Sequence, residues 1–190
     1  MKTGRLEAFS DGVLAIIITI MVLEIKVQEG FTFEVLRPLV PKFLSYLLSF
    51  IYVGIYWNNH HHLFQAIEKV NGKILWANLG LLFALSLIPF TTGWMGENHF
   101  ESNPVLLYGI NLLFSAIMFL ILAKSAIKHE GKDSKIGMAL QNKTKEMLSL
   151  GLYIIGIILA NFLPNISVIC YSLVAIIWLI PDTRIEKRLN

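Results

Sequence analysis

The residues best suited to chemistry in this 190-residue chain fall into two short groups. Ser10 and Asp11 stand side by side near the start, and His60, His61 and His62 follow one another in the first third. Consecutive helical side chains point about 100° apart, so the three histidines cannot close on one ion from a single helix. No nucleophile elbow or metal motif accompanies them. We therefore expect no metal, no cofactor and no enzyme.

The elements that carry these groups have the composition of a membrane protein. Hydrophobic residues make up 55% of the chain and charged residues 15%, whereas a soluble domain carries about 45–50% and about 25%. A helix of roughly 20 apolar residues crosses a hydrocarbon core about 30 Å thick. The stretches that are uncharged and long enough are 43–67, 74–96, 102–123 and 147–181. Pro164 and Asn165 predict a turn inside the last stretch, which then forms two helices.

The segment that precedes these stretches is shorter and more polar. Gly12–Leu23 is uncharged but lies between Asp11 and Glu24, and an acid at the centre of a spanning helix costs about 2.5–3.5 kcal/mol. Because the two acids lie near its ends, we expect this segment to cross while facing the bundle interior or water. The predicted fold class is all-α: one polytopic domain over 1–190 with six transmembrane helices and no conventional pore loop. The helices are expected near 5–26, 40–64, 72–96, 103–126, 145–163 and 165–181.

The basic residues predict the orientation in the membrane. Six crossings put both termini on one side, and of the 16 basic residues only Lys26, Arg37 and Lys42 fall on the other. Positive residues mark the cytoplasmic side, so we expect a multi-pass protein of the cell (inner) membrane with both termini cytoplasmic. The net charge of +3 reflects this bias and requires no nucleic-acid partner. The basic stretch 124–145 is expected to touch anionic membrane lipid.

A helical wheel divides the first helix into two faces. At 100° per residue, Gly12, Ile16, Thr19 and Leu23 form one stripe, with a single hydroxyl among apolar groups. The pair 10–11 lies about 120° to 140° from the centre of the stripe. Two interpretations stay open on spacing alone. The stripe is either ordinary helix–helix packing or a pore wall, in which rings of isoleucine and leucine gate by dewetting.

Arg5, Phe9, Ser10 and Asp11 occupy the fixed positions of an R-x-x-x-F-S-D motif at the start of the chain. This motif resembles the opening of the transmembrane protein 175 family of lysosomal and prokaryotic potassium channels. The segment 55–61 (Ile-Tyr-Trp-Asn-Asn-His-His) is similar to the late second helix of the same family. The resemblance implies a homotetramer of six-helix subunits that conducts potassium ions, with the first helix lining the pore.

The resemblance also implies roles for the stripe. By position, Ile16 would be the narrowest constriction, Thr19 a polar layer tied to potassium preference, and Leu23 a further apolar ring, with Gly12 on the same face.

Asp11 falls outside the stripe, and we expect it to be a buried carboxylate satisfied within the subunit. An unpaired acid inside the membrane is costly, so Arg5 or a histidine of the second helix is the expected partner. One of the first two histidines is expected to hydrogen-bond to the pair 10–11. The predicted members of this structural or gating network are Arg5, Phe9, Ser10, Asp11, His60, His61 and Asn78.

The predicted function is therefore a subunit of a potassium-selective cation channel with a modest preference for potassium over sodium. The alternatives are a secondary transporter and a proton-permeable channel or carrier. Carriers usually contain internal repeats, and none is recognisable here. An intramembrane enzyme would require catalytic histidines.

Overall fold

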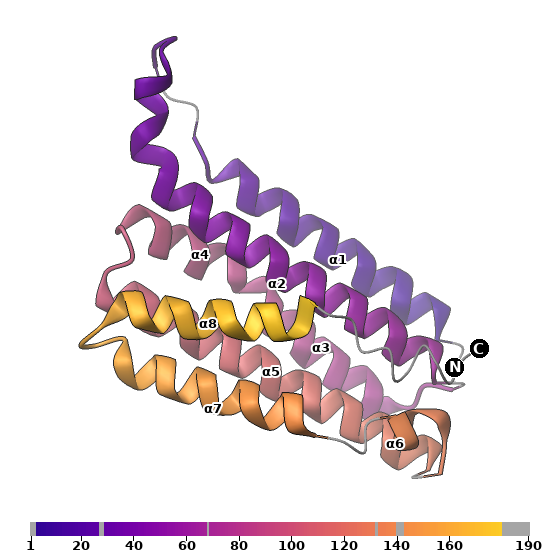
Figure 1. Ribbon diagram of the computed structural model, residues 1–190. Helices are drawn as coiled ribbons and strands as arrows, with labels where there is room; N and C mark the ends of the chain where they lie inside the picture. The colour runs from indigo at the N-terminus through magenta and orange to yellow at the C-terminus, as the bar shows by residue number, and fades with distance from the viewer. Residues whose placement is uncertain (1–2, 27–28, 68, 132, 140–142, 180–190) are drawn as a thin grey trace.

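The computed structural model describes residues 3–26, 29–67, 69–131, 133–139 and 143–179. The regular structure in these ranges is entirely helical, which confirms the all-α fold class (Figure 1). The elements in chain order are α1 (Gly4–Leu23), the 3-10 helix η1 (Phe33–Leu39), α2 (Val40–Gln65), α3 (Gly72–Ser86), α4 (Ile88–Glu97), α5 (Ser102–Glu130), α6 (Lys135–Ala139), α7 (Thr144–Leu159) and α8 (Pro164–Leu179).

Several of these helices are suited to a bilayer. Those long and apolar enough to cross it are Gly4–Leu23, Phe33–Gln65, Gly72–Glu97 and Ser102–Glu130. The chain is accordingly a multi-pass membrane protein. The last two helices, α7 and α8, have 16 residues each, which makes them about 24 Å long. The end expected at 181 lies outside the described residues, and η1 and α6 have no counterpart among the expected helices.

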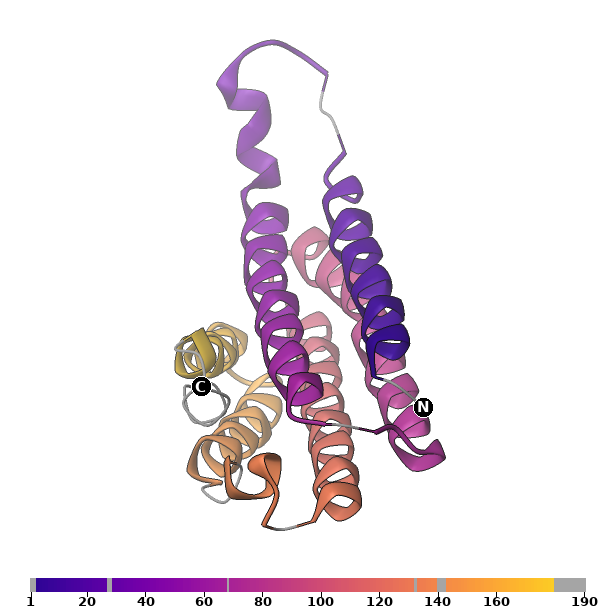
Figure 2. The same ribbon diagram turned by 90° about the vertical axis from the view of Figure 1, so that its right-hand side faces the viewer.

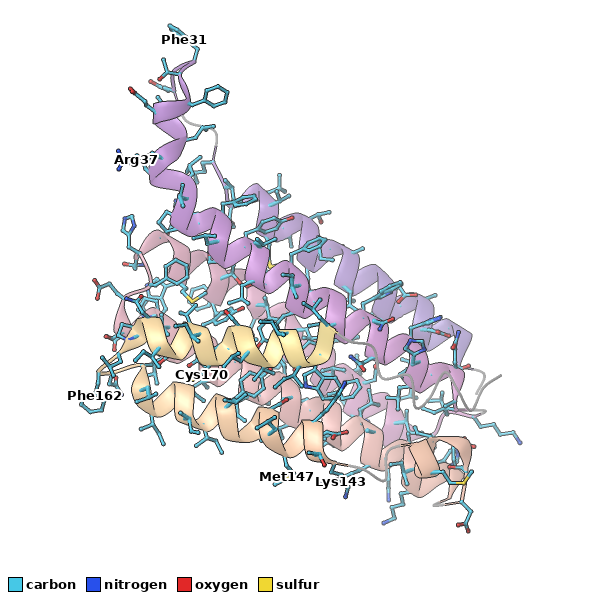
Figure 3. The ribbon with its side chains drawn as sticks, in the orientation of Figure 1. Phe31, Arg37, Lys143, Met147, Phe162 and Cys170 are labelled. Atoms are coloured by element: carbon cyan, nitrogen blue, oxygen red, sulfur yellow. The ribbon has the colours of Figure 1, made fainter. Side chains whose placement is uncertain are left out.

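The helices form one bundle in which α1 lies on one side and the α7–α8 pair on the opposite side (Figure 2). α1 packs against α2, α3 and α4, whereas α5 packs against α3, α4, α7 and α8. The segment that carries Phe31 and Arg37 projects beyond the end of the bundle (Figure 3). This arrangement leaves α1 at an edge, with one side of the helix free of intrasubunit neighbours.

Buried tyrosines form the centre of the core. Tyr52 of α2, Tyr108 of α5 and Tyr171 of α8 are fully buried, and the Tyr52 hydroxyl donates a 2.6 Å hydrogen bond to the carbonyl of Tyr171. Gly109 and Gly156 face the ring of Tyr171, and a Cβ at either glycine would clash with it. The two glycines therefore allow α5 and α7 to approach α8 closely.

The helix expected over 72–96 is interrupted between α3 and α4. Pro89 has no N–H, and its ring disfavours a continuous helix at this point. In an unbroken helix the Ile88 N–H would donate to the Ala84 carbonyl. Here the Asn111 amide, oriented by its hydrogen-bond partners, inserts between them: Nδ2 donates to Ala84 O (2.9 Å) and Oδ1 accepts from Ile88 N (3.2 Å). A side chain inserted into the helical ladder explains the break.

Candidate pore-lining face of the first helix

The two faces of α1 have different environments. The buried face is made by Leu6, Ser10, Leu14, Ile17 and Met21, which recur every three or four residues, as one side of a helix requires. Each residue of the predicted stripe is exposed in the subunit: Ile16 is 58% exposed and Leu23 76%. The wheel thus separated the faces correctly. What the exposed stripe does remains a prediction.

Two residues of the stripe have geometry relevant to a pore. The Thr19 hydroxyl donates to the Ile16 carbonyl at 2.9 Å, so its proton is directed at the helix and its oxygen lone pairs remain available. An oxygen in this state can coordinate a cation. A Cβ placed on Gly12 would meet nothing within 4 Å, so packing inside the subunit gives no reason for a glycine there.

A chain of hydrogen bonds lies behind the stripe, on the buried side of α1. His60 Nε2 is 2.8 Å from Asn78 Oδ1, Asn78 Nδ2 donates to Ser10 Oγ at 3.0 Å, and Ser10 Oγ donates to the Leu6 carbonyl at 2.9 Å. All three side chains are buried. Because Asn78 Oδ1 is an acceptor, the His60 proton lies on Nε2. A hydrogen bond between one histidine and the pair 10–11 was predicted; in the structure His60 is connected to Ser10 only through Asn78.

The predicted burial of Asp11 and its predicted partners are wrong, although a hydrogen bond within the subunit does satisfy the carboxylate. Its side chain is exposed in the subunit, and its Oδ1 accepts a 3.1 Å hydrogen bond from Trp57 Nε1 rather than from Arg5 or a histidine. The described residues contain no ion pair between Arg5 and Asp11, and Arg5 itself is exposed. The reason is rotational: the buried centre of α1 faces α3 and α4, and Asp11 lies at the margin of that face, beside α2. Phe9 is likewise 53% exposed and takes no part in the hydrogen-bonded chain.

His61 has a partner that was not predicted. Its Nδ1 lies 3.1 Å from Glu7 Oε1, and its ring stacks on Trp57 with centroids 6.1 Å apart. One turn of α1, from Glu7 to Asp11, therefore faces one turn of α2, from Trp57 to His61. The two i, i+4 pairs are visible in the sequence, but their pairing depends on the register of two antiparallel helices. No group of three histidine, cysteine or acidic side chains arranged to hold a metal ion occurs within the described ranges.

Comparison with known proteins places this arrangement in a family. A sequence model described as "Endosomal/lysosomal potassium channel TMEM175" matches residues 5–89. A protein named as a potassium channel from Chryseobacterium sp. (strain P1-3) is 60% identical over 190 residues, which span 100% of this chain and 99% of the relative. The chain belongs to the TMEM175 family.

Other members of the TMEM175 family are more distant. The crystal structure of a lysosomal potassium-selective channel TMEM175 homolog from Chamaesiphon minutus superposes with a TM-score of 0.81 at 30% identity, over 95% of this chain and 97% of that one. The mouse endosomal/lysosomal proton channel TMEM175 is 31% identical over 99 residues, which are 50% of this chain and 20% of the mouse protein. This TMEM175-family chain thus shares its fold with the Chamaesiphon channel along almost its whole length.

Proposed function

We propose that this chain is one subunit of a potassium-selective cation channel in which ions pass a central pore lined by α1. The observation that carries the proposal is the free stripe of α1. No element in the described part of the subunit covers Gly12, Ile16, Thr19 and Leu23, although the opposite face of the same helix is buried. The uncharged part of α1 is short and lies between Asp11 and Glu24, which makes it a poor surface for lipid, so we expect other copies of the chain to cover the stripe. The names of the Chryseobacterium and Chamaesiphon relatives support potassium as the ion.

The proposed assembly is a parallel homotetramer of six-helix subunits in the inner membrane. A helix that contributes one stripe lines a pore only when copies surround an axis, and cyclic symmetry provides this. The basic residues support cytoplasmic termini, although Lys2, Lys132, Arg184, Lys187 and Arg188 lie outside the described residues. The α7–α8 pair supplies the fifth and sixth crossings, and Figure 3 shows Phe162 of their connecting turn at the end of the bundle away from Lys143.

The proposed mechanism follows from the chemistry of the stripe. A ring of Ile16 side chains offers no oxygen to replace the water around an ion. The closed pore is therefore dry at this ring, and an ion crosses the open pore together with its water. One turn away, a ring of Thr19 oxygens replaces part of a hydration shell. Sodium holds its water more tightly than potassium, and partial replacement therefore gives a modest preference for potassium. Leu23 adds a second apolar ring, and Gly12 widens the pore on the other side of Ile16.

A second candidate is a proton channel, because the mouse relative carries that name. The buried chain from His60 through Asn78 and Ser10 ends at the Leu6 carbonyl. A backbone carbonyl cannot pass a proton on, so this row of hydrogen bonds is not a complete proton relay. Protons would instead have to follow the water in the pore.

The deciding experiment is ion flux through purified protein in liposomes, with separate potassium, sodium and proton gradients and protein-free liposomes as the control. We expect potassium flux faster than sodium flux and linear in driving force. Proton flux without potassium flux would favour the second candidate. Flux that saturates with ion concentration would favour a secondary transporter.

A further inference from the structure

A second feature lies away from α1, in a cavity between α2, α5, α7 and the end of α8. Its smaller part, with a volume of about 50 Å³, is lined by Tyr52, Tyr56 and Tyr153, all of them buried. The larger part has a volume of about 230 Å³ and reaches Lys124 and Lys143, which are exposed. That volume exceeds the roughly 150 Å³ of an engineered cavity that holds benzene. The residues that line both parts are Asn59, Phe119, Leu120, Glu146, Leu150 and Trp178.

Glu146 is the unusual member of this lining. Its Oε2 is buried and has no hydrogen-bond partner among the described residues. No ion pair in the described part of the chain joins it to Lys124 or Lys143. A carboxylate oxygen buried among apolar and aromatic groups is costly unless a cation or a donor meets it. Among the described residues, no positively charged or donating group therefore meets this oxygen.

The aromatic lining suits an ammonium group. Trp178 is held in place because its Nε1 donates a 2.8 Å hydrogen bond to Ser149 Oγ. Lys145 already places its ammonium nitrogen 5.8 Å from the centroid of the Trp178 ring. Tyr56 and Phe119, which line the cavity together with Glu146, meet edge to face, with centroids 6.1 Å apart. Aromatic faces next to a carboxylate are the usual surroundings of a bound organic cation.

The mouth of the cavity has the opposite charge. Lys124 and Lys143 are exposed at the end of the bundle where α7 begins, and Figure 3 shows Lys143 and Met147 at the start of α7. Lysine side chains at helix ends reach into the headgroup layer of the membrane. A molecule that enters here thus meets two ammonium groups first and a carboxylate further in.

We propose that this cavity binds the headgroup of a zwitterionic phospholipid of the phosphoethanolamine type. The ammonium group lies against Glu146 and the Trp178 and Tyr56 rings, and the phosphate lies between Lys124 and Lys143. The acyl chains remain in the bilayer beside Met147, which is 64% exposed. This site is separate from the pore proposed for α1, so the protein would bind lipid here whether or not it conducts potassium.

The experiment measures lipid binding to the full-length, delipidated protein in detergent by native mass spectrometry, with the rise in melting temperature as a second readout. The probes are short-chain phosphatidylethanolamine, short-chain phosphatidylglycerol, which lacks the amine, and free phosphoethanolamine, which lacks the chains. We expect phosphatidylethanolamine to bind about tenfold more tightly than phosphatidylglycerol, since one buried charge-assisted contact is worth about that factor. Free phosphoethanolamine should bind more weakly than the lipid but compete with it.

Variants locate the site. Glu146→Gln should remove the preference for phosphatidylethanolamine and leave phosphatidylglycerol binding unchanged, whereas Lys143→Gln should weaken both lipids. The matched control is Glu34→Gln, an exposed carboxylate on η1, which should change neither. Equal binding of the two lipids to the unaltered protein, or an unchanged preference in Glu146→Gln, would overturn the proposal. The comparison of lipids on the unaltered protein decides the question even if Glu146→Gln fails to fold.

Discussion

At the scale of single residues, the direction in which a side chain leaves α1 determines what it can do. Leu14 and Ile17 are buried in the subunit, whereas Ile16, one position from Ile17, is exposed. A polar substitution on the buried side of α1 therefore affects folding of the subunit. A polar substitution on the exposed side affects the proposed pore or the contact with another subunit. This separation makes the pore proposal testable with single substitutions.

The first prediction concerns the stripe itself. Ile16→Asn should wet the proposed constriction and raise conductance severalfold, because an amide holds water where isoleucine excludes it. Thr19→Ala should lower the potassium-to-sodium permeability ratio, since it removes the hydroxyl oxygen. The measurements are single-channel current and reversal potential in planar bilayers.

The matched control for this prediction is Val22→Asn. Val22 is exposed and lies about 120° from Ile16 around the helix, so conductance and selectivity should not change. Leu14 lies farther round the helix but is only 2% exposed, and Leu14→Asn would disturb folding instead. A rise in conductance in Val22→Asn, without one in Ile16→Asn, would move the pore to another face of α1.

The second prediction concerns the buried chain behind the stripe. Asn78→Ala should lower the free energy of unfolding by about 1–3 kcal/mol, because it leaves His60 Nε2 without its partner and removes the hydrogen bond that Ser10 Oγ accepts. Thermal unfolding in detergent measures this. Asn161→Ala, at an exposed asparagine in the α7–α8 turn, is the control and should have little effect. If both substitutions changed the free energy of unfolding equally little, the hydrogen bonds of His60, Asn78 and Ser10 would not stabilise the contact between α1 and α3.

At the scale of elements, two side chains determine how helices bend and how closely they pack. Asn111 of α5 occupies the break between α3 and α4, and Tyr171 of α8 fills the space opposite Gly109 and Gly156. Asn111 and Tyr171 each contact elements that are far from them in the sequence. Their contacts stabilise the bundle against which α1 packs.

The third prediction tests the helix break. Asn111→Ala should destabilise the protein by about 1–3 kcal/mol, because the Ile88 N–H loses its partner and the Ala84 carbonyl keeps only the Leu87 N–H, at 3.3 Å. Pro89→Ala in the same chain should recover part of this loss, since the helix can then close its own hydrogen bond. The midpoints of thermal unfolding of the single and double variants give the coupling. Strictly additive effects would mean that the amide and the proline act independently.

The fourth prediction uses two glycines of the same helix. Gly156→Ala should lower the free energy of unfolding by about 1–3 kcal/mol, because the added methyl overlaps the Tyr171 ring. Gly151→Ala, where a Cβ would meet nothing within 4 Å, should be neutral or stabilising by up to about 1 kcal/mol through helix propensity. Denaturation of the two variants side by side is the measurement. The same sign at both positions would contradict the close packing of α7 on α8.

At the scale of the whole molecule, the position of α1 at an edge of the bundle and of α7–α8 on the far side gives each subunit two distinct flanks (Figure 2). In a cyclic assembly with α1 innermost, the first flank faces the axis and the second faces lipid. The proposed cyclic assembly rests on this asymmetry together with the uncovered stripe, whereas the number of four subunits rests on the family resemblance.

The fifth prediction tests that assembly by cross-linking. In a Cys170→Ser background, Ile16→Cys should be joined between subunits by a short bis-maleimide, because copies of the stripe meet around the axis. Ile158→Cys, exposed on α7, should stay monomeric because it faces lipid. Denaturing gels detect the joined pair, and native mass spectrometry in nanodiscs counts the subunits. Cross-linking at position 158 but not at position 16 would mean that α7 faces the axis of the assembly and α1 faces lipid.

The amino-acid sequence alone determined the all-α fold class, the two faces of α1 and the membership of the TMEM175 family. These depend on local properties: hydrophobic length, a period of 3.6 residues, and a motif within seven consecutive positions. The partner of Asp11, the pairing of Glu7 with His61 and the exposed setting of Phe9 were decided only by tertiary structure. They depend on the register and rotation of α1 against α2, which a wheel of one helix does not contain. The Asn111 amide at the break near Pro89 has the same origin, because a proline marks where a helix opens but not which distant side chain completes its hydrogen bonds.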